Sequence, residues 1–101
     1  MADTDTIERV KEVVQVREPS MYKVLLHNDD STTFDFVINV LMKIFHKKLD
    51  EAVEITKAIH VAGQGIAGSP YTREIAEEKA HETVMYSRAN GFPLTATFEE
   101  L

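Results

Sequence analysis

The sequence predicts an α+β fold in which a small three-stranded antiparallel sheet is covered on one face by three helices. The first observation is length, because 101 residues fit one compact domain and leave no room for two. The second is the order of hydrophobic patterns, which runs strand, helix, helix, short strand, helix, strand. Three short strands cannot bury both faces of a sheet in so small a domain, so helices on one side are the economical arrangement.

Composition excludes several classes of protein. Apolar residues make up 44% of the chain, which is enough for a hydrophobic core. Cysteine is absent, which removes disulfides, thiolate nucleophiles and cysteine-based zinc sites and fits a reducing cytosol. The net charge of -6 argues against nucleic-acid binding, and no apolar run approaches the roughly 18 to 20 residues that span a bilayer. We therefore expect a cytoplasmic monomer without membrane contact, metal ion or cofactor.

The N-terminal residues 1–18 mix acidic and basic side chains and lack the basic-then-apolar order of a signal peptide. Pro19 and Ser20 close this segment. Its short apolar stripe has no helix caps, so we expect a mobile extension over residues 1–18 and a folded core over residues 19–101.

A strand and an amphipathic helix open the core. In "MYKVLL", Tyr22, Val24 and Leu26 alternate with other residues, as in a strand with one buried face. Thr32 or Thr33 is suited to cap the helix that follows. Its apolar residues recur at spacings of three and four and are Phe34, Val37, Ile38, Leu41, Ile44 and Phe45.

Two further helices and two strands complete the pattern. A helix over about 50–62 is expected to begin at Asp50 as N-cap and to end before Gly63. "GQGIAGSP" is rich in glycine and leaves room for only a short strand around Ile66. The last helix should start at Thr72 and end at Asn90-Gly91, and Leu94, Ala96 and Phe98 should share one face of the final strand.

The junction "HNDDSTTF" between the first strand and the first helix supports two interpretations. Asn28, Asp29 and Asp30 offer oxygen acceptors to a cationic amine, and the Asn28 amide offers donors as well. Apolar surface to line a pocket beside them would come from Phe34, Val37, Thr56 and Ile59. Alternatively, Asn28 and Asp29 form an Asx-turn while Asp30 or Thr32 caps the helix. The residues alone leave both interpretations open.

Catalytic and metal chemistry find weaker support. Asp29 and Asp30 are adjacent, so in an extended segment their carboxylates diverge instead of meeting at one substrate atom. A metal-dependent hydrolase could use His27, Asp29 and His60, yet no close ligand spacing is present. His60 shares a helical face with Thr56, which suits either a residue at the edge of the core or part of a polar site. We therefore expect that the protein is not an enzyme.

The stretch "PSMYKVLLHNDDSTTFDFVINVL" closely resembles the ClpS adaptors of the bacterial N-degron pathway. Those proteins carry a P-x-M-Y-K-V-x-L-x-N-D-D-x-T-x-x-(E/D)-F-V-x-x-V-L block, and the similarity continues through "AIHVAGQGIAG", "YTREIAEEKA" and "NGFPLTATFEE". The resemblance implies a sheet with three helices on one side, shared with the C-terminal domain of the ribosomal stalk protein. It also implies an adaptor that holds the first residue of N-degron substrates, which is Leu, Phe, Tyr or Trp, and delivers them to the ClpA unfoldase of the ClpAP protease.

The resemblance assigns roles by position. Asn28, Asp29 and His60 would bind the α-amino group and the first peptide unit of the substrate. Glu74 and Lys79 match positions that contact the unfoldase. The pocket for the first side chain would be formed by Leu26, Thr32, Phe34, Val37, Thr56, Ile59 and Leu94.

Three residues depart from the common pattern of the family. Phe34 and Thr56 stand where many members have methionine, and Thr33 replaces a common proline. A rigid ring and a smaller pocket wall should alter the preference among first residues, and we expect the ring to exclude Ile and Val. The alternative function is a docking module of the ribosomal-stalk type that has no amino-acid pocket.

Overall fold

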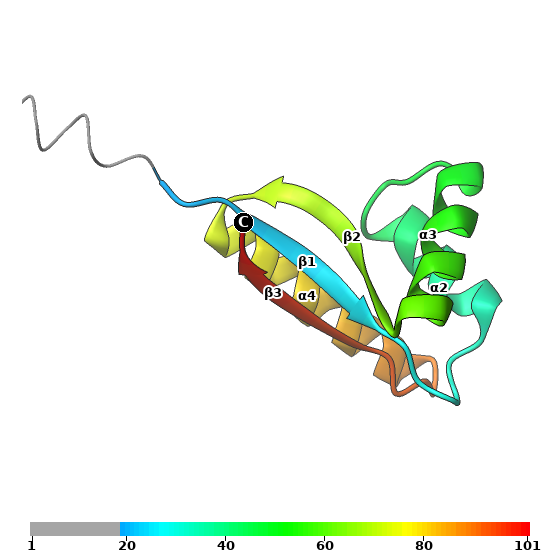
Figure 1. Cartoon of the computed structure of the whole chain (residues 1–101). Helices are drawn as coiled ribbons and strands as arrows, with labels where there is room; N and C mark the ends of the chain where they lie inside the picture. The colour runs from blue at the N-terminus through cyan, green and yellow to red at the C-terminus, as the bar shows by residue number, and fades with distance from the viewer. Residues whose placement is uncertain (1–18) are drawn as a thin grey trace, which may run out of the picture.

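The structure, a computed structural model, describes residues 19–101, and the predicted mobile extension lies outside them. The chain forms β1 (Tyr22–His27), α2 (Phe34–Lys43), α3 (Leu49–Ala62), β2 (Gln64–Tyr71), α4 (Arg73–Ala89) and β3 (Thr95–Glu100) (Figure 1). β1 is the central strand of the sheet, with the order β2-β1-β3, and it pairs antiparallel with both neighbours. The predicted α+β fold with three strands and three helices is confirmed.

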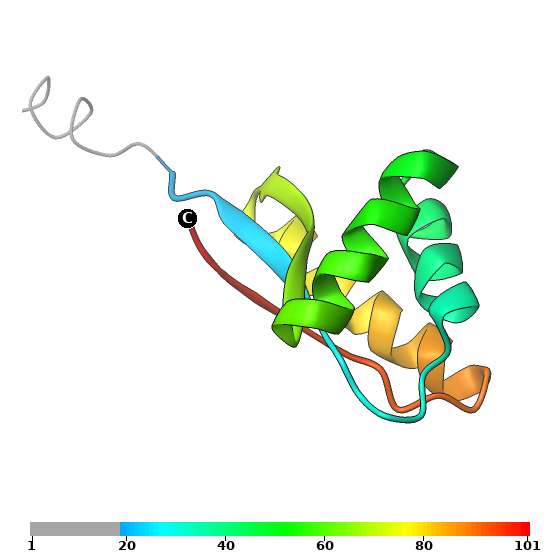
Figure 2. The ribbon, with the colours of Figure 1, turned by 45° about the vertical axis from the view of Figure 1, so that its right-hand side comes forward.

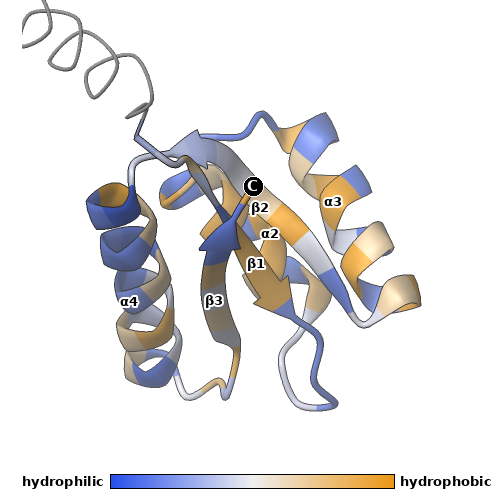
Figure 3. Cartoon of the chain, turned by 60° about the vertical axis from the view of Figure 1, so that its left-hand side comes forward, coloured by the Kyte–Doolittle hydropathy of each residue, from blue (hydrophilic) through white to orange (hydrophobic). Residues whose placement is uncertain are grey.

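The core lies against one face of β1. Val24 and Leu26 on this face have no exposed surface and join one apolar cluster with residues of all three helices. α4 runs along the back of the sheet, whereas α2 and α3 pack together at one end (Figures 1 and 2). Colouring by hydropathy shows the apolar centre of the sheet and a largely hydrophilic α4 surface (Figure 3). Leu25 belongs to the opposite face, where its cross-strand neighbours are Ile66 and Thr97.

The helix ends agree with the sequence at most positions. The Thr33 hydroxyl caps α2 by accepting a hydrogen bond of 3.2 Å from the Phe36 amide, and Thr72 caps α4 in the same way. The prediction of Asp50 as the cap of α3 was wrong. The carbonyl of Lys48 already accepts a bond from the Ala52 amide, so the N-cap is Lys48, two residues before the predicted one. Asp50 instead lies in the first turn, where the helix dipole favours its negative charge.

The strand after α3 is longer than predicted. β2 covers eight residues, although its glycines and Pro70 indicated only a short strand around Ile66. An edge strand tolerates a residue without a backbone N–H, and pairing with the buried strand β1 holds the rest of the segment in place. Gly65 lets this strand approach α3 closely, because a Cβ atom there would lie 2.7 Å from the Ile59 side chain.

Candidate functional site

A cavity of about 220 Å³ opens where β1 ends, between the junction that leads into α2 and the last turns of α3. Its lining combines a polar mouth with an apolar wall. The lining residues are Asn28, Asp29, Asp30, Thr32, Phe34, Val37, Thr56, Ile59 and His60. The sequence-predicted site residues from the junction, α2 and α3 are therefore brought together at this cavity.

The carboxylate of Asp29 organises the junction. Its Oδ1 atom accepts hydrogen bonds from the backbone amides of Ser31 at 2.8 Å and Thr32 at 2.7 Å. Its Oδ2 atom accepts a third bond, of 2.6 Å, from the Thr32 hydroxyl. This is the Asx-turn chemistry considered from the sequence, but Asp29 provides it alone and the helix cap falls to Thr33.

These contacts keep Asp29 ionised. Burial alone would raise the pKa of its carboxyl group. The hydrogen bonds from Thr32 and Ser31, together with the positive charge of Arg88, outweigh that effect and lower the pKa below its usual value of 3.8. A full negative charge is therefore present at the cavity at neutral pH.

From the sequence, Asp30 was predicted either to offer an acceptor to a cationic amine or to cap the following helix, and it lines the cavity. Its side chain is exposed and forms no hydrogen bond or ion pair within residues 19–101. The Asn-Asp-Asp run is the sequence signal that indicated it. Once Asp29 is used by the turn, the next residue offers the free carboxylate.

Two contacts join the junction to the end of α3. The backbone amide of Asn28 donates a hydrogen bond of 2.8 Å to the carbonyl of Gly63, the left-handed residue that ends the helix. The rings of Phe34 and His60 meet edge to face, with their centroids 5.4 Å apart. In the described part of the chain, the side-chain amide of Asn28 and the His60 ring form no intramolecular hydrogen bond, so both are available to a ligand.

The apolar wall of the cavity comes from α2 and α3. Val37, Thr56 and Ile59 are buried, whereas Phe34 stands at the rim with 43% of its surface exposed. Leu26 and Leu94, which were also predicted to form the pocket, are almost completely buried in the core and are not among the lining residues. They belong to the same apolar core cluster as Val37 and Ile59.

The two predicted unfoldase contacts have different surroundings. Glu74 is exposed on α4 and lines a broad groove of about 810 Å³ between that helix and β3. Lys79 is half-buried, and its Nζ atom donates a hydrogen bond of 2.9 Å to the carbonyl of Ile44 at the end of α2. The same ammonium group lies 5.8 Å from the ring centroids of Phe45 and Tyr71. Lys79 therefore also ties α4 to the rest of the fold.

The hydrolase hypothesis required His27, Asp29 and His60 to converge. Nε2 of His27 is instead 2.7 Å from the Thr97 hydroxyl on β3. Across residues 19–101, no three His, Cys, Asp or Glu side chains gather into a metal-binding group. The same part of the chain contains no helix of the length and apolar character needed to cross a bilayer.

The chain is similar in sequence and in structure to known proteins. The profile of the family "ATP-dependent Clp protease adaptor protein ClpS" matches residues 17–97. The Clp protease adapter protein ClpS of Lawsonia intracellularis is 49% identical over 87 residues, covering 86% of this chain and 79% of the relative. The Campylobacter jejuni protein of the same name (strain 81-176) is 46% identical over 100 residues and 99% of both chains. A solved structure of Agrobacterium tumefaciens ClpS2 bound to L-phenylalaninamide matches with a TM-score of 0.79 and 36% identity, covering 83% of this chain and all of that one.

Proposed function

The chain belongs to the ClpS family of ATP-dependent Clp protease adaptors, and on that basis we propose that its cavity binds the first residue of N-degron substrates. The ligand is a free N-terminus followed by a bulky hydrophobic side chain, which is Leu, Phe, Tyr or Trp. The protein then delivers the substrate to the ClpA unfoldase of the ClpAP protease and has no catalytic activity of its own. The observation that carries this proposal is one cavity with an ionised, hydrogen-bonding mouth and an apolar wall.

The mouth suits an α-ammonium group. The side-chain carbonyl oxygen of Asn28 and a ring nitrogen of His60 can act as acceptors, and neither side chain forms an intramolecular hydrogen bond in the described chain. The resemblance to the ClpS family implies that the carboxylate of Asp29 binds the α-amino group of the substrate. Oδ1 of Asp29 already accepts two hydrogen bonds and Oδ2 one, so this carboxylate has little accepting capacity left. The Asp30 carboxylate accepts none within residues 19–101, and we therefore assign the direct ion pair with the amine to Asp30. Asp29 then holds the loop in place and adds negative charge.

The cavity suits a large apolar side chain. An engineered apolar cavity of about 150 Å³ holds benzene, so a volume of about 220 Å³ leaves room for an aromatic or leucine side chain. Burial of such a side chain is worth roughly 1.5 to 3 kcal/mol. The similar ClpS2 is described with L-phenylalaninamide, which carries both a free α-amino group and a phenyl side chain.

Delivery requires a second surface. We propose that Glu74 and Lys79 on α4 contact the unfoldase, as their positions in the family imply, and that residues 1–18 take part in the handover. A docking module without an amino-acid pocket would have no need for the polar and apolar halves of the cavity. The cavity therefore favours the adaptor over the stalk-like alternative.

A pair of peptides tests the proposal. One peptide begins with leucine and has a free amine, and its twin is N-acetylated; both carry a fluorophore at the C-terminus for anisotropy titration. Acetylation removes the charge, and because each charge-assisted hydrogen bond contributes roughly 1.5 to 3 kcal/mol, we expect affinity to fall by about tenfold or more. Equal affinities of the two peptides would rule out recognition of the free N-terminus.

A further inference from the structure

We propose that Thr56 places a hydrogen-bond acceptor deep in the wall of the cavity, so that the site prefers a first residue with a donor at the far end of its side chain. Tyrosine, with its phenolic hydroxyl, is the best match, and the indole N–H of tryptophan is the other candidate. The inference rests on the proposed function of the cavity and refines its substrate class.

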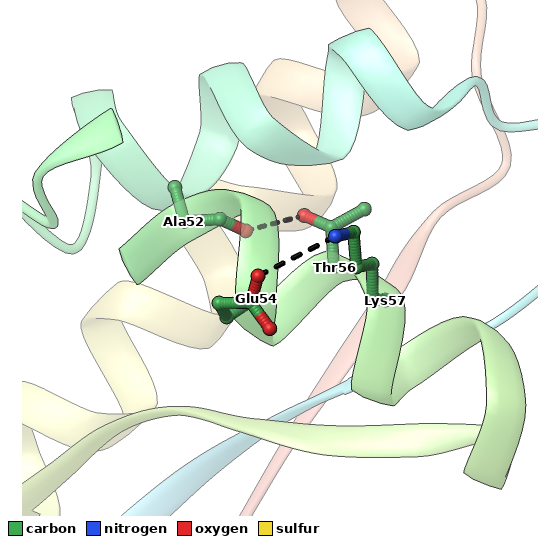
Figure 4. A network of polar contacts seen from close by, with 4 residues as sticks. All are labelled: Ala52, Glu54, Thr56 and Lys57. Carbon is green, nitrogen blue, oxygen red and sulfur yellow. Dashed lines mark hydrogen bonds and ion pairs between the residues drawn. The ribbon is translucent and has the colours of Figure 1, made fainter. Parts of the chain in front are cut away.

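Thr56 is a buried polar residue in an otherwise apolar part of the lining. Only 2% of its surface is exposed, and its neighbours in the wall are Val37 and Ile59. The threonine hydroxyl donates its proton to the carbonyl of Ala52, one turn back along α3, at 2.7 Å (Figure 4). A hydroxyl group has one donor and two acceptor positions. With its proton engaged, Thr56 can offer a ligand only an acceptor.

The position of Thr56 along α3 fits the far end of a bound side chain. It lies four residues before His60 on the same helical face, a separation of about 6 Å along the helix axis. An amine held at the mouth by His60 directs its side chain along this face toward Thr56. The other polar groups of the lining belong to the junction or to His60, so Thr56 is the one polar side chain of the lining that lies on α3 a turn away from His60.

The first test uses the unaltered protein and three peptides that differ only in the first residue, which is tyrosine, phenylalanine or 4-fluorophenylalanine. The fluorine atom occupies the para position but cannot donate a hydrogen bond. A neutral hydrogen bond has a net value that corresponds to roughly a 2- to 10-fold change in affinity. We expect the tyrosine peptide to bind more tightly than both others by such a factor. Equal or weaker binding of the tyrosine peptide overturns the inference.

The second test changes the acceptor. Thr56→Val keeps the branched shape and removes the hydroxyl, and the Ala52 carbonyl retains its helical bond from the backbone amide of residue 56. Thr56→Ser is the matched control because it keeps the acceptor. We expect the ratio of tyrosine to phenylalanine affinity to fall to about one in the valine variant and to stay above one in the serine variant. A ratio that persists in Thr56→Val overturns the inference.

The two proposals fail in different ways. If free-amine peptides bind no better than their acetylated twins, the proposed function fails and this inference fails with it. If they bind better but the tyrosine preference is absent, only the role of Thr56 is wrong. Circular dichroism establishes that each variant is folded, and the comparison among the three peptides needs no variant at all.

Discussion

Asp29→Ala removes the acceptor of three hydrogen bonds at once, whereas Asp30→Ala removes a carboxylate that makes none within residues 19–101. The two adjacent substitutions should therefore differ in their effect on the stability of the domain. Asp29→Ala should lower the stability of the domain and weaken the binding of every accepted peptide, because the loop that forms the mouth loses the three hydrogen bonds that hold it. Asp30→Ala should leave stability within about 0.5 kcal/mol of the original protein and weaken binding directly.

The magnitudes follow from the contacts. Asp29 is partly accessible, so water replaces some of the lost bonds, and the loss resembles the removal of a helix N-cap. We expect Asp29→Ala to lower the free energy of unfolding by about 1 to 2 kcal/mol. Each kcal/mol lowers the Tm of a domain of this size by roughly 4 to 8 °C. For Asp30→Ala, loss of a charge-assisted bond to the amine should reduce peptide affinity by roughly 10- to 150-fold.

Thermal unfolding followed by circular dichroism and anisotropy titration with a leucine-initiated peptide measure the two effects. Asp29→Asn is the matched control, because its side-chain oxygen can still accept from the amides of Ser31 and Thr32, so it should recover most of the stability. The reasoning is refuted if Asp30→Ala lowers the Tm as much as Asp29→Ala does. It is equally refuted if Asp29→Ala leaves the Tm unchanged.

Three more predictions concern pH, specificity and packing. Because the folded-state pKa of Asp29 is lowered, the original protein should be more stable than Asp29→Asn above about pH 3.8, and this difference should vanish as the pH falls further. A difference in melting temperature between the two proteins that stays constant down to acidic pH would contradict this. The Phe34 ring should favour leucine over isoleucine as first residue by about tenfold, and Phe34→Ala should reduce that ratio; comparable affinities in the original protein would contradict it. Lys79→Met should lower the free energy of unfolding by about 1 kcal/mol through loss of the bond to the Ile44 carbonyl, while Glu74→Gln on the exposed face should not; equal melting temperatures would count against this role.

The fold could be predicted where local chemistry and hydrophobic period agree. The spacing from Phe34 onward, the capping threonines and Gly63 fix the helices, because each feature acts within a few residues. β2 was underestimated because its glycines and Pro70 lower local strand propensity, whereas its pairing with β1 depends on residues about 40 positions away. Asp50 failed as a cap because the preceding turn, with His46 in a left-handed conformation, fixes where α3 begins.

The candidate site, like the fold, could be predicted only in part from the sequence. Residue types and the family pattern placed Asn28, Thr56 and His60 in one predicted site, and the structure brings the three residues to one cavity. The separate duties of Asp29 and Asp30 could not be read from two identical neighbours. Only the hydrogen bonds show which carboxylate is engaged by the turn and which is free. Likewise, only the packing shows that Leu26 and Leu94 are buried in the core and do not line the cavity.

The hydrogen bond from Asn28 to Gly63 has a kinetic consequence. It fixes the two sides of the mouth to each other before any ligand arrives, so association needs no rearrangement of the backbone. Peptides with different first residues should then bind at similar rates, in the ordinary range of about 10⁵ to 10⁷ M⁻¹s⁻¹. Their differences in affinity should appear as differences in dissociation rate, so that preferred N-termini are those that stay bound longest.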